Sequence, residues 1–152
     1  MSLIRRRATL DDIPRMVEMG EAFTTAVAMP IAFDAAGFAE QLAKMIEHPG
    51  AFVQVIDNGE LGAVGGIGGL AGQHMLFPAV LTATELFWWI EPEFRGSTQA
   101  LRLVTDFEEW AAGLGCVVVA VSMFVADGRV QTFLERRGFV HYESSFVRRL
   151  AA

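Results

Sequence analysis

The first fifty residues contain one short β-prone run followed by two stretches with helical spacing of apolar positions. Residues 3–8 are predicted to form an opening strand. The run Thr9-Leu10-Asp11-Asp12 then indicates a capping-box start, with acidic residues in the first turn of a helix. A second helix is predicted to begin near Asp34 and to end at His48-Pro49-Gly50. Its apolar residues share one face: Phe38, Leu42, Met45 and Ile46.

The middle of the chain shows the pattern of a β-hairpin. Residues 51–56 and 61–70 are β-prone, and the Asn58-Gly59 pair between them is the strongest short-range hairpin signal. The second run contains four glycines, at positions 65, 66, 68 and 69. Such glycines permit a bulge or a close approach of another backbone, and a loosely specified strand end is the alternative. Residues 72–81 are predicted to form a loop.

The second half of the chain predicts alternating strands and helices. A strand over residues 83–90 is followed by a helix that Gly113 and Gly115 end. Residues 116–124 have the apolar pattern of a buried strand. Asp127 is predicted to cap a helix that runs to about Arg137 and ends at Gly138, and residues 139–150 to supply one or two closing strands. The predicted order is β-α-α-β-β-β-α-β-α-β, a mixed α/β (α+β) fold in a single domain spanning residues 1–152.

Composition narrows the class of protein. The chain has 152 residues, of which 53% are hydrophobic and 20% charged, as expected for one well-packed domain. A net charge of −6 argues against a nucleic-acid binder, which would show a basic stripe. No apolar run approaches the length needed to span a bilayer, so we expect a soluble, cytoplasmic protein without membrane contacts. The high apolar content is compatible with a homodimer.

Cysteine and histidine give no support for a disulfide or a metal site. Cys116 is the single cysteine and lies in an apolar run, where a small core residue is the expected role. The three histidines share no ligand spacing: His48, His74 and His141. We therefore expect no metal.

The junction between the strand over residues 83–90 and the following helix is the clearest candidate site. The first amides of a helix have no intrahelical acceptor, so they can bind an anionic group. The chain has neither a Walker A pattern nor a GxGxxG run after its first strand, which excludes the common nucleotide-binding loops. A diphosphate held at this turn would place the rest of its carrier beside the strand that ends at Ile90.

Two motifs around this junction resemble those of the GNAT superfamily of acyl-CoA-dependent N-acetyltransferases. The family's Q/R-x-x-G-x-G/A signature is similar to residues 95–100, in which Arg95 and Ala100 match and Thr98 replaces the first signature glycine. A second family pattern, N-x-x-A-x-x-x-Y-x-x-x-G-F, keeps its spacing over residues 127–139. Here Asp127 replaces the asparagine and Leu134 the tyrosine.

The resemblance implies a mostly antiparallel sheet that splays open to admit acetyl-CoA as the cosubstrate. Its pantetheine arm would pair with the backbone of Trp88, Trp89 and Ile90. Its diphosphate would bind the amides of the turn, with Arg95 as a further phosphate contact and Asp127 nearby. The amides belong to six residues: Gly96, Ser97, Thr98, Gln99, Ala100 and Leu101. A side chain at Thr98 disfavours positive φ and crowds a phosphate, so weaker coenzyme binding is expected.

The candidate catalytic residues follow from the same resemblance. Leu134 stands where the family's usual acid is a tyrosine, and leucine has no proton to donate. Tyr142, the only tyrosine, is the candidate acid, with His141, Ser122 or water as alternatives. Glu85 is the candidate base; regular alternation places it on the face of Phe87 and Trp89, where apolar surroundings would raise its pKa toward neutrality.

The function implied is transfer of an acetyl group from acetyl-CoA to a primary amine of a small molecule or peptide. The first alternative is a GNAT-fold module that binds coenzyme with little or no catalysis, which Thr98 and Leu134 motivate. The second is an unrelated α/β sensor or interaction domain in which the turn is only structural.

Overall fold

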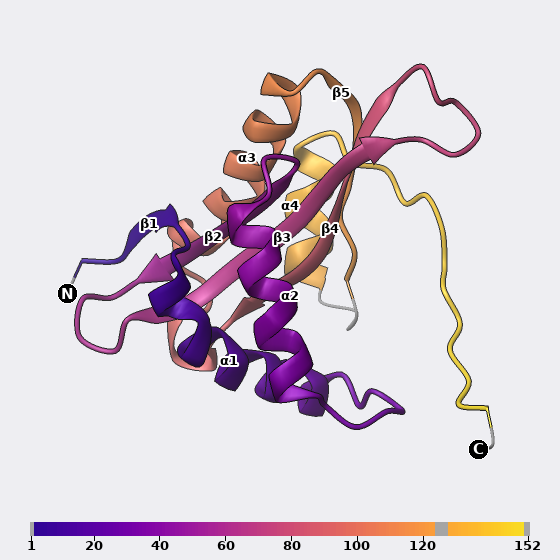
Figure 1. Cartoon of the computed structure of the whole chain (residues 1–152). Helices are drawn as coiled ribbons and strands as arrows, with labels where there is room; N and C mark the ends of the chain where they lie inside the picture. The colour runs from indigo at the N-terminus through magenta and orange to yellow at the C-terminus, as the bar shows by residue number, and fades with distance from the viewer. Residues whose placement is uncertain (1, 124–127, 151–152) are drawn as a thin grey trace.

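The computed structural model describes residues 2–123 and 128–150, which form a mixed sheet flanked by helices (Figure 1). Within these residues the sheet has five strands in the order β1-β2-β3-β4-β5, and the only parallel pair is β4 with β5. The strands are β1 (Ile4–Arg7), β2 (Ala51–Asp57), β3 (Ala63–Gln73), β4 (Leu81–Ile90) and β5 (Cys116–Ala120). The predicted mixed and mostly antiparallel fold class is confirmed.

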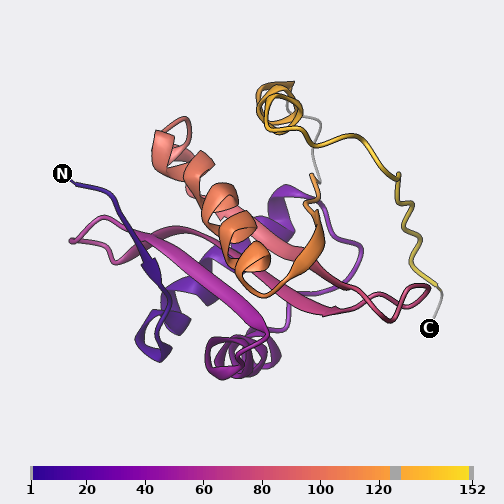
Figure 2. The same cartoon turned by 90° about the horizontal axis from the view of Figure 1, so that it is seen from above.

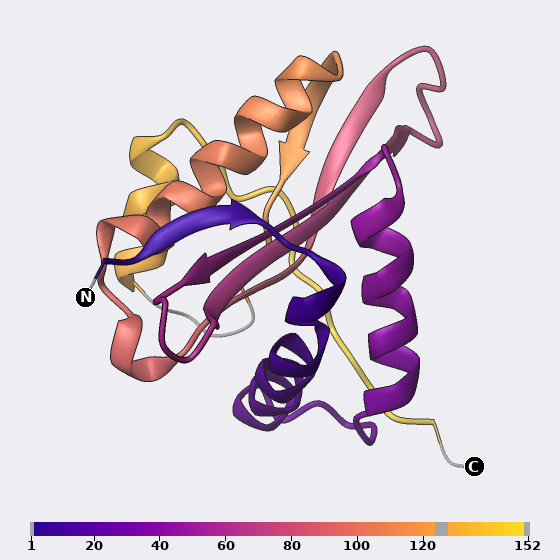
Figure 3. The same ribbon diagram turned by 60° about the vertical axis from the view of Figure 1, so that its left-hand side comes forward.

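Helices cover both faces of this sheet. One face carries α1 (Ile13–Ala26) and α2 (Ala35–Glu47), and the other carries α3 (Thr98–Gly113) and α4 (Gly128–Arg136), as Figure 3 shows. Each face has its own apolar cluster: Phe107 and Leu103 of α3 are fully buried on one side, and Leu42 of α2 on the other. The sheet is therefore buried between two helical layers, which is the usual solution for strands that are apolar on both faces.

Helix α2 begins, and helices α3 and α4 end, where the sequence predicts. Asp34 is the N-cap of α2, where its Oδ1 accepts the amide of Gly37 at 2.9 Å. Gly115 and Gly138 follow α3 and α4 with φ angles of 85° and 89°. At the end of α4, the amides of Gly138 and Phe139 donate to the carbonyls of Glu135 and Leu134, the two bonds of a Schellman motif.

The predicted hairpin is formed by β2 and β3. Its turn is longer than a two-residue Asn-Gly turn, because the Asn58 amide donates to the carbonyl of Gly62 across a five-residue connection. The glycines of β3 are explained by close approach. A Cβ on Gly68 would lie 2.3 Å from the Phe87 ring, and a Cβ on Gly69 would lie 2.6 Å from the Phe107 ring. Of the two interpretations of these glycines, the structure supports close packing.

Two expectations for the C-terminal part differ from the structure. β5 is not a buried strand, since the side chains of Val117 and Val118 are 65% and 55% exposed. Residues 139–150 form no strand at all; they follow α4 as an extended segment outside the sheet (Figure 1). The physical reason is shared, because an apolar run becomes a buried strand only when another strand or layer covers it, and among the described residues β5 has a neighbour on one edge only.

Candidate functional site

The two halves of β4 have different surroundings. Its first half pairs with β3 on one edge and with β5 on the other, and the β5 ladder ends at Thr84 opposite Ala120. Its second half, residues 85–90, keeps only the β3 ladder. Within the described ranges, no strand pairs with this second half on the β5 side. The strands therefore separate at Glu85, as expected of a splayed sheet.

A β-bulge lies at the same point. Gly68 is paired with Phe87 and Gly69 with Glu85, so β4 has one extra residue, Leu86. Ala83 consequently packs in the cluster beside α3, whereas Phe87 packs in the cluster beside α1 and α2. In a regular strand these two side chains would share a face. The alternation that placed Glu85 on the face of Phe87 and Trp89 is thus interrupted at Leu86.

Glu85 is buried at this separation point. Glu85 is only 5% exposed, and its Oε2 accepts a hydrogen bond from the amide of Ser122 at 3.0 Å. Burial raises the pKa of the Glu85 carboxyl to about 7, and the Ser122 hydrogen bond opposes that shift. The expected direction of the shift is confirmed. A carboxyl with this pKa can both accept and release a proton near neutral pH.

The first turn of α3 presents free backbone donors. Gly96 has a φ angle of 81°, and Ser97 is the N-cap, with Oγ accepting the amide of Ala100 at 3.3 Å. Among the described residues, the amides of Gly96, Ser97, Thr98 and Gln99 have no hydrogen-bond acceptor. This helix N-terminus follows the free half of β4 after the 3₁₀ turn Pro92–Phe94, and it is suited to an anionic group.

Thr98 does not distort this turn. Positive φ occurs at Gly96, whereas Thr98 is the first residue of α3 and has an ordinary backbone conformation. Of the two reasons to expect glycine here, the need for positive φ does not apply. The other reason remains, because the exposed Thr98 side chain would crowd a phosphate. Gln99 turns its side chain away from the amides, because its Oε1 accepts from the Arg5 guanidinium on β1.

Arg95 contacts the end of β4. Its Nε donates to the carbonyl of Ile90 at 2.9 Å, and its guanidinium lies 4.6 Å from the ring centroid of Trp89. This arrangement braces the turn against the end of β4. It also covers one face of Trp89, which excludes a simple aromatic cage for a cationic acceptor at that ring.

The three residues predicted to pair with a coenzyme point to different sides of the sheet. Trp88 and Ile90 pack in the cluster beside α3, and Trp89 packs in the cluster beside α1 and α2. Trp89 meets the ring of Phe23 edge-on, with centroids 6.0 Å apart. The indole nitrogens of Trp88 and Trp89 are buried without a hydrogen-bond partner among the described residues. Such donors are uncommon in a folded protein.

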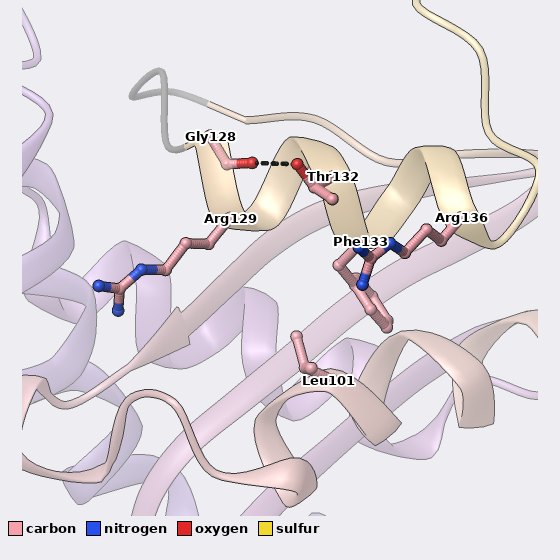
Figure 4. Close-up of a pocket in the computed structure, with 6 residues that line it drawn as sticks. All are labelled: Leu101, Gly128, Arg129, Thr132, Phe133 and Arg136. Carbon is pink, nitrogen blue, oxygen red and sulfur yellow. Dashed lines mark hydrogen bonds between the residues drawn. The ribbon is translucent and has the colours of Figure 1, made fainter.

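A groove between α3 and α4 was not foreseen from the sequence. One cavity of about 400 Å³ is lined by Leu101, Phe133, Arg129 and Arg136, among others, and Figure 4 shows Phe133 pointing from α4 toward Leu101. A second cavity, of about 590 Å³, shares Leu101 and Phe133 and extends to Thr98. Arg129, Phe133 and Arg136 are spaced at four and three residues, so helical spacing could have identified them as one face of α4.

The candidate acids are less favourably placed. Leu134 is buried in the cluster beside α3, so the position of the family's tyrosine holds an apolar side chain in the core. Tyr142 is 86% exposed in the segment after α4. His141 Nε2 lies 3.5 Å from Ser144 Oγ in that same segment, and Ser122 offers its amide to Glu85. Asp127 lies outside the described residues.

The described residues include no group of three or more His, Cys, Asp or Glu side chains arranged to bind a metal ion. Within those same residues, every helix is too short or too polar to traverse a bilayer. Burial raises the pKa of the Cys116 thiol, which keeps it protonated and of low reactivity.

Comparison with known proteins agrees with this geometry. The model of the acetyltransferase (GNAT) family matches residues 18–139. A transcriptional regulator from Bacillus halodurans C-125 is 18% identical with a TM-score of 0.80, covering 98% of this chain and all (100%) of that one. An acetyltransferase from Trypanosoma brucei is 19% identical with a TM-score of 0.75, covering 98% and 100%. Glucosamine-6-phosphate N-acetyltransferase from Arabidopsis thaliana is 12% identical with a TM-score of 0.77, covering 99% and 100%.

A search of curated proteins finds no match to the chain. The solved structures share its fold at low identity, and the family model covers most of its length, including the splayed strand, the turn and α4. The chain therefore belongs to the acetyltransferase (GNAT) family.

Proposed function

We propose that residues 1–152 form one acetyltransferase domain that transfers an acetyl group from acetyl-CoA to a primary amine of a small molecule or peptide. The observation that carries this proposal is the continuity of three features. The unpaired half of β4 begins at the buried Glu85 and is followed, after the 3₁₀ turn Pro92–Phe94, by the free amides of the α3 turn. A substrate with an extended polar arm and a diphosphate needs these features in that order.

Acetyl-CoA is treated as a substrate, and the residues present fit it. The amides of residues 96–99 would bind the diphosphate, since they are donors without acceptors within the described chain. The free edge of β4 would hydrogen-bond the amides of the pantetheine arm as an added strand does. Coenzyme A carries a third phosphate besides its diphosphate. Positive charge for this group would come from Arg129 and Arg136, which line the groove between α3 and α4.

Glu85 supplies the acid–base chemistry of the proposal. With a pKa of about 7, its carboxylate can take a proton from the acceptor's ammonium group or from the nitrogen as it attacks. The new C–N bond forms at the thioester carbonyl, and the C–S bond breaks. Glu85 takes one of the two protons that the nitrogen loses, and water passes the other to the departing thiolate, because Leu134 offers no proton and Tyr142 is 86% exposed.

The acceptor side of the site is aromatic. On the face of α1 and α2, Phe38 lies edge-on to Phe33 and Phe87, with centroids 5.7 and 6.2 Å apart. These rings pack on one another, and Phe38 and Phe87 contact the apolar cluster. They support an acceptor with an apolar or aromatic body beside its amine, recognised by its shape.

The decisive test is replacement of Glu85 by glutamine, assayed by thiol release from acetyl-CoA with a panel of primary amines. We expect kcat/KM to fall by about 10²–10⁴, with loss of the limb of the pH profile that titrates near pH 7. Glu93→Gln, at an exposed position close to the turn, is the matched control and should retain activity. An unchanged acidic limb in Glu85→Gln would refute the role of this carboxyl.

A second candidate is a module that binds coenzyme with little or no catalysis. The specific observation in its favour is the buried Leu134 together with the 86% exposure of Tyr142, which leaves the splay without a tyrosine among the described residues. Calorimetry with CoA separates the two functions. Binding of CoA without thiol release for any amine supports the module, and binding with release supports the enzyme.

A further inference from the structure

The register between β3 and β4 decides which backbone groups of β4 face its free side, where β5 has ended. The amide of Glu91 donates to the carbonyl of Val64 at 2.9 Å, and the next pair along the ladder is Ile90 with Gly65. In an antiparallel ladder, pairs that exchange hydrogen bonds alternate with pairs that do not. The amide and carbonyl of Ile90 therefore point away from β3, and those of Trp88, two residues earlier, do the same.

Arg95 occupies one of these four free-side groups. The backbone of Trp89 points to β3 by the same alternation, so Trp88 and Ile90 supply two amides and two carbonyls. Within the described residues, no strand lies against them on this side. The carbonyl of Ile90 nevertheless has a partner, because Arg95 Nε donates to it at 2.9 Å. This carbonyl is the last acceptor of β4 before the turn that leads to α3, so Arg95 closes the end of the free side.

A stacked aromatic ring holds Arg95 at this carbonyl. The guanidinium lies 4.6 Å from the ring centroid of Trp89, and that ring meets Phe23 of α1 edge-on. Ile90 packs in the cluster beside α3 and Trp89 in the cluster beside α1 and α2, and Figure 2 shows α2 and α3 on opposite sides of the sheet. Arg95 itself is exposed, so its replacement leaves both apolar clusters in place.

We propose that Arg95 is a positioning residue that satisfies the Ile90 carbonyl before the coenzyme arm binds, an inference that rests on the proposed function. An extended arm laid along the free side of β4 displaces water from this carbonyl. An acceptor that loses its water and gains no donor weakens binding. Arg95 supplies the donor in advance, so the part of the arm beside Ile90 needs no polar group. The polar groups of the arm are then left to pair with the amide of Ile90 and with the backbone of Trp88.

The test separates a donor for the Ile90 carbonyl from a charge for the phosphates. Its probes are CoA and 3′-phosphoadenosine 5′-diphosphate, which keeps the three phosphates and lacks the pantetheine arm. Arg95→Met removes both the donor and the charge. Arg95→Gln removes the charge only, because the glutamine Nε2 is as many bonds from the backbone as the arginine Nε. Arg102→Met, at an exposed position in the second turn of α3, is the control for loss of charge.

Calorimetry with each probe gives the result as a ratio of dissociation constants. Arg95→Met should weaken the binding of CoA about tenfold more than that of the diphosphate probe, because only the arm covers the Ile90 carbonyl. Arg95→Gln and Arg102→Met should weaken both probes by the same factor, and circular dichroism checks that the variants fold. Equal losses for the two probes in Arg95→Met overturn the proposal, and so does a Gln variant that behaves like the Met variant. A wild-type chain that binds neither probe contradicts the proposed function itself.

Discussion

β2 and β5 are valine-rich strands of the same sheet, yet they have opposite environments. β2 lies between β1 and β3, and six of its seven residues are buried, from Ala51 to Ile56. β5 lies at the end of the strand order, and none of its five residues is buried. Both were predicted as strands, and both are. Their difference teaches that an apolar run determines strand formation, whereas burial depends on what lies beside and above the strand.

A similar contrast exists between the packed middle of the sheet and the region where β4 and β5 separate. The region around β2 and β3 is a rigid support, covered by α2 on one face and α3 on the other. The region where β4 parts from β5 has unpaired backbone, a buried carboxyl and free helix amides. Binding sites need groups that are still unpaired, which is why the proposed function is placed at this part of the sheet.

The largest expected effect compares two phenylalanines. Phe107→Ala should destabilise the protein by about 3–5 kcal/mol, because its side chain is completely buried in the cluster beside α3. Phe146→Ala removes the same atoms from a position that is 96% exposed and should change stability by less than about 0.5 kcal/mol. Urea unfolding at low protein concentration measures both. Equal losses would erase the distinction between the two regions.

The next effect concerns the carboxyl at the boundary of the two regions. Because the folded pKa of Glu85 is raised from 4.5 to about 7, the folded state holds this proton more tightly than the unfolded state. Its contribution to stability is therefore present at low pH and is lost as pH rises from about 4.5 to about 7. Glu85→Gln should flatten that slope and be more stable than wild type at pH 8, by up to about 3 kcal/mol.

The measurement for Glu85 is the free energy of unfolding across pH 4–9. Glu60→Gln, in the exposed turn of the β2–β3 hairpin, serves as the control and should keep the wild-type slope. If the Glu85→Gln curve parallels wild type throughout, the carboxyl is not held in a desolvated site.

A smaller effect tests the packing of β3 against its neighbours. A methyl group on Gly69 would lie 2.6 Å from the carbonyl oxygen of Thr84 and 2.6 Å from the Phe107 ring. Gly69→Ala should therefore cost about 1–3 kcal/mol. Gly72→Ala, in the same strand, meets nothing within 4 Å and should stay within about 0.5 kcal/mol of wild type. Thermal unfolding of the pair checks the difference, and equal melting temperatures would contradict it.

The smallest effect lies at the first turn of α3, which joins the packed region to the site. Ser97→Ala removes the side chain that accepts the Ala100 amide and should destabilise the protein by about 0.5–1 kcal/mol. Ser145→Ala, in the exposed segment after α4, has no such cap to lose and should be neutral. The same urea titration measures both, and a neutral Ser97→Ala would show that the cap is not needed for the turn.

Local sequence signals predicted most of the elements. Asp34, Gly115 and Gly138 mark helix ends because capping and positive φ depend on neighbouring residues only. Asn58-Gly59 located the hairpin for the same reason. The turn before α3 could also be predicted from neighbouring residues, because the first amides of any helix have no acceptor within the helix.

The site was less accessible to sequence reasoning. The bulge at Leu86 depends on the ladder with β3, so alternation along β4 alone misplaced the face of Glu85. Ser122 meets Glu85 from 37 residues away. Arg95 stacks on Trp89 and donates to the carbonyl of Ile90, two contacts that the sequence did not predict. The bulge, the Ser122 hydrogen bond and the Arg95 contacts all depend on which segments pack together. The residue pattern along a single segment does not contain that information.

The sequence by itself determined where the helices and the five observed strands lie and where α3 begins, because those depend on periodicity, capping and glycine conformations within a few residues. Tertiary structure alone decided that Glu85 is buried, that β5 has a neighbour on one edge only among the described residues, and that residues 139–150 form no strand. Burial and strand pairing are relations between segments far apart in the chain, so their free energies are set only when the chain has folded.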